Sequence, residues 1–412
     1  MQYFKNVELT KLYPVSESAV RKWIDAARQG KLELQLYEHK GKAHIANTAK
    51  NLRLIEELVA RGKKYKNTRA HKVVTPKKEF YELYSRKQIF DIISNVEIHH
   101  ELPLQYSYFD GGVDYWDNYT KRLWNEEGDN TLNATVRLLR SSLGVIDSLI
   151  EDYDRVNVID IGVGNGLPVK ELLSHLLYER AALGRYVGID ISAEMLNLAR
   201  KNINKWFEGR VDFEGYERDI TYERFDDLIA KEDPHKAINL VLAVGGTLNN
   251  LRSPSDALRT IYNSIGRNDL FITATKLDSE EARRYFDFNA ELGMPRLAKN
   301  HRILLDLLNI EDSFYDVEQF YDETRRARFI RVKLKVDLTL TIELEGMKRR
   351  IELYKGDTLL LWRATHQTDI DIIEQCNQSG LALLQAVITR DRQFFLSISE
   401  IDTTSQSAIY LP

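Results

Sequence analysis

Residues 158–173 read VIDIGVGNGLPVKELL, and this stretch decides the fold. A short apolar run leads into glycines on alternate positions, and a pattern with helical spacing follows. Glycine lets the backbone pass close to a ligand, and the first N–H groups of the following helix stay free to face polar atoms. The stretch therefore predicts a strand, a ligand-binding turn and a helix, the opening unit of a Rossmann-like α/β sheet.

The positions of the acid and the glycines indicate which ligand the turn binds. Asp160 lies two residues before Gly162, and Gly164 and Gly166 follow at alternate positions. A phosphate-binding loop would end in Gly-Lys-Ser/Thr and a dinucleotide turn would read G-x-G-x-x-G, and the stretch has neither. Because an acid before the first glycine suits a positively charged ligand without phosphates, the spacing favours S-adenosylmethionine.

Three further strand ends support the same ligand. Residues 155–275 alternate apolar strands with amphipathic helices, which is typical of a parallel sheet with crossover helices. The second strand ends at Asp190, which can accept both ribose hydroxyls, and the third is followed by Asp219 and Ile220, within reach of an adenine. The fourth, NLVLAVGGTLNNL, opens into a turn at the same edge. Strand ends in this order predict a methyltransferase.

Composition and charge bound the rest of the interpretation. The chain has 412 residues and a formal net charge of −4, yet residues 1–78 contain 18 Lys and Arg against 7 Asp and Glu. A basic head on an acidic body is expected, and a length above about 300 residues favours at least two domains. The single cysteine, Cys376, excludes an internal disulfide. No apolar run is long enough to span a membrane and no signal-peptide pattern is present, so a cytoplasmic protein is expected.

The first 65 residues have a pattern of their own. Ser16 can cap a helix that stops at Gly30, residues 32–45 alternate as a small hairpin, and a second amphipathic helix is expected from Thr48 to about Ala60. This order resembles the winged helix-turn-helix of MerR-type and excisionase-type DNA-binding domains. Since phosphates attract basic side chains, the resemblance implies DNA contacts from this unit. The candidates are Arg21, Lys22, Arg28, Lys40 and Lys42.

The segments after the head complete the predicted domain plan. Residues 66–80 are dense in Lys and Arg and contain a proline, which predicts a basic linker. Residues 81–154 have helical spacing and are expected to start a substrate domain, followed by the cofactor-binding core at 155–278. The remainder, 279–412, returns to the substrate domain. A helical pattern is expected over 276–325, then antiparallel strands, the last of which join the sheet.

Several motifs together resemble one enzyme family over roughly residues 104–400. They are YSYFDGG, IDIGVGNG, GIDIS, GGTLNNL, ATKLDS and a late FFLSI. The most specific is GGTLNNL, which is similar to the Gly-(Gly/Ser)-Thr-x-x-Asn turn of the histidine-specific, S-adenosylmethionine-dependent α-N-methyltransferases of ergothioneine biosynthesis, to which dimethylallyltryptophan N-methyltransferases are related. The resemblance implies a Rossmann-like class I methyltransferase core with an additional α+β substrate domain.

The resemblance also implies roles for single residues. Gly245 and Asn250 fall where the family holds the α-amino group of its substrate, and Gly246 and Thr247 lie in the same turn. The family's tyrosine for the substrate carboxylate aligns with RRYFDFN, where Tyr285 is the candidate.

The side-chain pocket departs from the family. A tyrosine that contacts the imidazole is replaced by Phe109, next to Tyr108, and a Glu and a Ser on a late strand align with Leu359 and Leu361. A site built to hydrogen-bond an imidazole loses far more from such changes than from a change of size. The departures disfavour histidine and favour an apolar or aromatic amino-acid-like amine.

Two classes of function stay open. The first is an N-methyltransferase acting on a small-molecule amine with S-adenosylmethionine, and the second is a DNA-binding transcriptional regulator whose methyltransferase-like domain senses that cofactor or a metabolite. A third, lower-ranked possibility is that the basic head binds a macromolecular substrate, such as a peptide or a nucleic acid, and presents it to the site. The histidines at 99, 100 and 366 lack metal-site spacing, so no metal is expected. Winged modules often act as dimers, so a homodimer is a further expectation.

Overall fold

The computed structural model describes residues 3–13, 15–109, 111–126, 130–180, 182–229, 236–280, 283 and 297–402. These form two compact units. The first consists of Met1–Val73 with two short segments, Val336–Thr339 and Glu352–Lys355, and the second contains the rest of the chain. Among the described residues, no helix is both long and apolar enough to cross a membrane.

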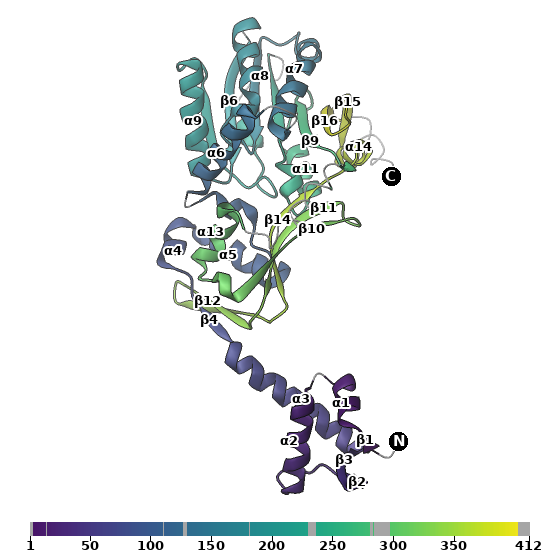
Figure 1. Ribbon diagram of the computed structural model, residues 1–412. Coiled ribbons are helices and arrows are strands. Elements are labelled where there is room, and N and C mark those ends of the chain that lie inside the picture. The colour runs from purple at the N-terminus through teal and green to yellow at the C-terminus, as the bar shows by residue number, and fades with distance from the viewer. Residues whose placement is uncertain are drawn as a thin grey trace, which may run out of the picture. The chain divides into compact units, whose positions relative to one another are not determined.

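The first unit is a small helical bundle with a three-stranded sheet of order β1-β3-β2 (Figure 1). The Ser16 side chain caps the second helix by accepting a hydrogen bond from the Ala19 N–H, as predicted. Val20, Ile24, Ile45 and other buried side chains form a core of its own. The elements in chain order are β1 (Tyr3–Phe4), α1 (Asn6–Leu12), α2 (Glu17–Arg28), β2 (Leu36–His39), β3 (Lys42–Ala46) and α3 (Ala49–Ala70).

Two boundaries in this unit differ from the sequence prediction. The hairpin strand begins at Leu36 rather than Leu32. The helix predicted to end near Ala60 continues to Ala70, so the first part of the predicted linker at 66–80 is helical, and β4 (Lys72–Val74) follows. The reason lies in propensity, because Lys, Arg and Ala favour a helix and no proline occurs between Thr48 and Pro76.

The second unit is built on a seven-stranded sheet of order β15-β16-β9-β8-β5-β6-β7. The strands from β5 to β9 are parallel, as predicted for 155–275, and β16 runs antiparallel between β9 and β15. The strands are β5 (Arg155–Ile161), β6 (Leu183–Asp190), β7 (Phe213–Glu217), β8 (Ala237–Val244), β9 (Leu270–Lys276), β15 (Leu381–Ile388) and β16 (Phe394–Ile401). The helical segments around the sheet are α7 (Thr131–Leu149), η3 (Leu167–Val169), α8 (Lys170–Ser174), η4 (His175–Glu179), α9 (Ala193–Phe207), α10 (Asp226–Ile229), η5 (Leu248–Asn250), α11 (Pro254–Tyr262) and α14 (Asp369–Gln378).

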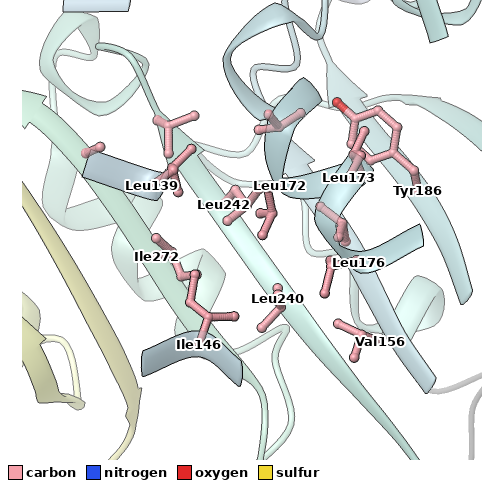
Figure 2. Packing of buried hydrophobic residues seen from close by; sticks show 14 of the residues in the cluster. Leu139, Ile146, Val156, Leu172, Leu173, Leu176, Tyr186, Leu240, Leu242 and Ile272 are labelled. Carbon is pink, nitrogen blue, oxygen red and sulfur yellow. The ribbon is translucent and has the colours of Figure 1, made fainter. Parts of the chain in front are cut away.

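Apolar side chains cover both faces of this sheet. On one face, Leu139 and Ile146 of α7 and Leu172 of α8 pack against Leu240 and other strand residues (Figure 2). The other face has a second buried cluster, which includes Cys376, so the lone thiol is a core residue as expected. Burial on both faces explains why the parallel strands have continuous apolar runs.

The rest of the second unit forms the region predicted as the substrate domain. It has a sheet of order β10-β11-β14, and β12 and β13 pair as neighbours. The helical prediction for 276–325 is wrong over β10, which pairs with β11 along its whole length, so tertiary pairing overrides a weak local pattern. The remaining elements are α4 (Lys78–Leu83), α5 (Arg86–Ser94), η1 (Asn95–His99), η2 (Leu104–Tyr108), α6 (Gly112–Asn125), α13 (Lys299–Leu307), η6 (Asp312–Phe314), β10 (Tyr315–Asp322), β11 (Ala327–Leu334), β12 (Leu338–Leu344), β13 (Met347–Leu353) and β14 (Thr358–Thr365).

Candidate active site

The predicted acids lie at the carboxyl edge of neighbouring parallel strands. Asp160 is the penultimate residue of β5, Asp190 is the last residue of β6, and Asp219 follows β7 by two residues. In the strand register Asp190 lies opposite Glu217, and Asp160 lies opposite Gly188. Ligands of open α/β sheets bind at this edge.

The glycine loop connects the acids to the turn after β8. Gly162 has a φ of +68° and donates its N–H to the Ile189 carbonyl at 2.8 Å. A Cβ atom on Gly162 would lie 2.5 Å from Oγ1 of Thr247, so only glycine fits there. The backbone of Gly164 hydrogen-bonds to Asp190, and Gly166 is the N-cap residue of η3, with a φ of +75°. The loop therefore brings β5, β6 and the Thr247 turn together.

Two of the carboxyl groups, those of the buried Asp160 and the half-buried Asp190, have no cationic partner among the described residues. Asp160 is 2% exposed and accepts a hydrogen bond from the Tyr186 hydroxyl at 2.8 Å, and burial raises its pKa to about 7. Burial also raises the pKa of Asp190 to about 6, although backbone N–H groups of Ser192 and Gly164 lower it. No described lysine or arginine pairs with either carboxylate. Because a buried carboxylate requires compensation, the edge fits a cationic nucleoside such as S-adenosylmethionine.

The third acid makes its contacts locally. Asp219 accepts a hydrogen bond from the Thr221 N–H at 2.9 Å, and its own N–H donates to Glu223. Asp219 also helps to raise the pKa of Tyr222, after desolvation, which is the main cause. The neighbouring Ile220 is buried. This loop forms the β7 side of the edge, where the sequence predicts the adenine.

The turn after β8 holds the predicted amine ligands. The Gly245 N–H donates to the Ala274 carbonyl at 3.0 Å, and the Asn250 N–H donates to the Gly246 carbonyl at 3.2 Å. Gly246 has a φ of +139°, which favours glycine. Within the part of the chain that the structure describes, the Asn250 side-chain amide makes no hydrogen bond, so it is available to a ligand.

The predicted substrate-pocket residues are placed on two sides of this region. Tyr108 is half-buried, and burial and the nearby Asp190 raise its pKa. Phe109 is buried and packs edge-on against Tyr84, with ring centroids 5.0 Å apart. Leu359 and Leu361 are buried on β14, which contacts η5. Tyr285 lies outside the described residues.

Helix α6 supplies contacts that the sequence did not indicate. Nε1 of Trp116 lies 3.4 Å from the position of a Cβ on Gly164, and the Asn165 side chain donates to Oδ1 of Asp117 at 3.1 Å. Asp117 is buried and also pairs with Lys121. These contacts from α6 therefore help to fix the position of the glycine loop. Only the aromatic run around Trp116 signalled this region.

A charged bridge links β14 to the turn after β8. Nη1 of Arg252 donates to Oδ1 of Asn95 at 2.7 Å and lies 3.9 Å from Glu101, which also pairs with Arg363. Side chains far apart in the sequence meet in this bridge, so no spacing rule predicts it. The bridge ties the Asn250 turn to the substrate-domain sheet.

The sheet order, the glycine loop and the acids at the strand ends define the class of Rossmann-like α/β proteins that bind a nucleoside at the carboxyl edge. Residues 86–400 match the family described as "Histidine-specific methyltransferase, SAM-dependent". The chain belongs to this family and is a methyltransferase that uses S-adenosylmethionine.

Comparisons with solved structures give only distant similarities. An S-adenosylmethionine-dependent methyltransferase from Clostridium acetobutylicum is 13% identical with a TM-score of 0.38, covering 70% of this chain and 98% of that one. Magnesium protoporphyrin IX methyltransferase from Synechocystis is 12% identical with a TM-score of 0.38, covering 72% of this chain and 97% of that one. 1,6-Didemethyltoxoflavin-N1-methyltransferase from Burkholderia thailandensis is 11% identical with a TM-score of 0.36, covering 77% of this chain and 91% of that one. No curated protein sequence matches the chain.

Proposed function

We propose that the protein transfers a methyl group to the amine of a small apolar or aromatic amino-acid-like molecule. The observation that carries this proposal is the Asn250 amide, which has no partner among the described residues and follows β8 at the carboxyl edge. Apolar residues support the substrate class, since Phe109, Leu359 and Leu361 are all buried.

The chain's own residues have a simple task in this reaction. The amide oxygen of Asn250 and the carbonyl of Gly245 orient the amine, in the roles that the resemblance gives them. An α-amine with a pKa of about 8 is partly neutral at cellular pH, so a strong dedicated base is not required. When bound, S-adenosylmethionine supplies a methyl group already activated by its sulfonium, and the protein's contribution is orientation.

The family description names histidine, and the pocket residues argue for a different side chain. By the resemblance, Phe109, Leu359 and Leu361 replace groups that hydrogen-bond an imidazole. An imidazole N–H facing leucine would lose its hydrogen bond on leaving water, at a cost of roughly 1–3 kcal/mol per group. An aromatic or aliphatic side chain has no such cost.

A methylation screen tests the proposal. The purified protein is incubated with S-adenosylmethionine and L-tryptophan, L-phenylalanine, L-leucine or L-histidine, and N-methyl products are measured by mass spectrometry. We expect at least one apolar amino acid to react roughly tenfold faster than histidine, and N250A to lose the activity while still binding S-adenosylhomocysteine. Preferred methylation of histidine would overturn the substrate class, and cofactor binding without methylation of any amine would overturn the proposed activity.

A second candidate function concerns the first unit. Arg21, Lys22 and Arg28 on α2 and Lys40 and Lys42 at the β2–β3 turn are all exposed. The order α2, β2, β3, α3 is the one expected from the winged helix-turn-helix resemblance. We propose that this unit binds duplex DNA through these side chains, which would give the protein a regulatory role.

Fluorescence anisotropy of the full chain with a labelled mixed-sequence duplex tests DNA binding. The affinity is expected to fall steeply between 50 and 200 mM salt, and R21Q/K22Q is expected to weaken it and reduce the salt slope by about two. K348Q, which changes an exposed lysine of the second unit, is the matched control. Affinity that ignores salt, or an equal loss in K348Q, would count against the proposal.

A further inference from the structure

Helix α5 meets the loop after β7 with two charged side chains that lie one turn apart. The helix is anchored by buried residues, among them Ile89, which is 1% exposed. Lys87 and Asp91 are four residues apart and therefore share one face of α5. This face meets the loop of residues 219–223 through the contacts of Lys87 and Asp91.

Lys87 is linked to the backbone of Asp219 through a single carboxylate. Nζ of Lys87 pairs with Oε1 of Glu223, and Oε2 of Glu223 accepts a hydrogen bond from the Asp219 N–H at 2.7 Å. The Glu223 N–H donates in turn to the Asp219 carbonyl at 2.8 Å. Partial burial acts to raise the pKa of Glu223, but Lys87 and the Asp219 N–H hold it below its ordinary value. Glu223 therefore connects α5 to the backbone of Asp219 as an ionised carboxylate.

The side chain of Asp219 is oriented from within the same loop. Its Oδ1 accepts the hydrogen bond from the Thr221 N–H, and the Tyr222 hydroxyl comes within hydrogen-bonding reach of the carboxylate. Nζ of Lys87 lies over the Tyr222 ring, 5.1 Å from its centroid. Because an ionised carboxylate has about four acceptor positions, Asp219 keeps acceptor capacity for a donor outside the loop.

The second charged residue on this face of α5 is fixed by a buried partner. Asp91 accepts a hydrogen bond from the hydroxyl of Tyr106 at 2.8 Å, and Tyr106 is 1% exposed. Asp91 is also one of the charges near the Tyr222 hydroxyl. The buried contact holds α5 in place beside the loop, so Lys87 has a defined position relative to Glu223.

We propose that Lys87 and Glu223 are positioning residues for recognition of the cofactor base, which hold the Asp219 carboxylate where it accepts a hydrogen bond from the exocyclic amino group of adenine. In hypoxanthine an oxygen replaces this amino group, so two acceptors would face each other and the analogue would bind more weakly. A helix that precedes the parallel sheet in the chain thereby contributes to the choice of nucleoside. The inference concerns the cofactor and goes beyond the proposed methyl transfer to an amine.

The ratio of two affinities tests this positioning without any methyl transfer. Calorimetry gives the Kd of S-adenosylhomocysteine and of S-inosylhomocysteine, which differ in the base alone, for the full chain and its variants. We expect the wild type to prefer adenine at least roughly tenfold, and D219A to lose this preference. K87Q is expected to reduce the preference about two- to threefold, as for a partly exposed ion pair, and E223A to remove most of it.

Two lysine variants serve as controls. K87R keeps a cation beside Glu223 and should keep the preference. K78Q removes a lysine that pairs with Glu82 at 2.7 Å on the surface of α4, and it should also leave the preference unchanged. A general loss of stability lowers both affinities alike and leaves their ratio unchanged, so the ratio reports the position of Asp219.

Equal affinities for the two ligands in the wild type, or a preference that persists in D219A, would overturn the inference. An unchanged preference in both K87Q and E223A, or an equal loss in K78Q or K87R, would also overturn it. If E223A does not bind S-adenosylhomocysteine, E223Q replaces it, because it keeps an oxygen for the Asp219 N–H and loses the charge, and it is expected to lose at least about twofold of the preference. A base preference that depends on Lys87, without methylation in the amino-acid screen, would refute the proposed activity alone.

Discussion

Asp160 is the residue at which the stability of the ligand-free protein and the binding of the cofactor make the most clearly opposed demands. It is buried against the Tyr186 hydroxyl, and no described cation pairs with it. Its ionised form is therefore costly in the ligand-free protein and useful when a positively charged ligand arrives. The group has opposite effects on stability and on binding.

D160N is expected to separate these two effects. It should raise the free energy of unfolding of the ligand-free chain at pH 8, on the order of 1–3 kcal/mol, because no charge remains to be buried. It should also weaken the binding of S-adenosylmethionine at least roughly tenfold, because the sulfonium loses a counter-charge. Thermal unfolding and calorimetry measure the two quantities, with D212N, which changes an exposed acid, as control. Unchanged cofactor affinity would contradict the assignment.

The pH dependence of cofactor binding follows from the same group. Its folded pKa of about 7 lies above the ordinary value, so the folded ligand-free chain gains a proton as the pH falls through 7. That proton must leave before a cationic ligand is compensated, so affinity should fall about tenfold between pH 8 and pH 6. Calorimetry at both values checks this, and D160N should flatten the profile. A flat profile in the wild type would refute it.

At the scale of the element, the glycine loop depends on the close approach of the Gly162 backbone to the Thr247 side chain. G162A is expected to abolish cofactor binding, because the new Cβ would meet Thr247 and the φ of +68° disfavours alanine. G144A is the matched control, since Gly144 lies within α7 with open space around it. It should stabilise the chain by about 0.5–1 kcal/mol. Thermal unfolding and S-adenosylhomocysteine titration measure both, and normal binding by G162A would be a contradiction.

The elements of the core could be predicted because their local signals agree with their tertiary roles. Strands β5, β6, β8 and β9 are largely apolar and buried on both faces, and the acidic residues Asp160 and Asp190 and the glycines of the loop fall at strand ends. The strand β10 was missed because half-buried residues such as Glu318 and Gln319 weaken its alternation. The end of α3 was missed because its charged residues were taken for a linker.

Parts of the candidate site could not be predicted from spacing. Lys87, Asp117 and Glu101 acquire their surroundings from segments far away in the chain, and a single charged residue in a helix or strand carries no local signal. A register irregularity at Leu361 adds a residue to β14. The face of the sheet on which the side chains of Leu360 and Trp362 lie is therefore known only from the strand pairing. The functional residues at the strand ends could be predicted, and the residues that surround them in space could not.

At the scale of the whole molecule, the two units have separate cores. Calorimetric unfolding of the full chain is therefore expected to show two transitions. S-adenosylhomocysteine at 100 times its Kd should stabilise the transition of the second unit by about 2.7 kcal/mol and leave the other unchanged. Differential scanning calorimetry checks this, with G162A, which is expected to abolish cofactor binding, as the variant that loses the shift. A common shift of both transitions would be inconsistent with independent units.

The antiparallel strand β16 has a consequence for how the enzyme is made. It pairs with β9 on one side and β15 on the other, so residues 394–401 complete a sheet whose parallel strands lie more than a hundred residues earlier. During synthesis the β9 edge stays unpaired until residues 394–401 have emerged from the ribosome. Such edges invite aggregation, so the pairing of β16 with β9 covers an edge that a partly synthesised chain would expose.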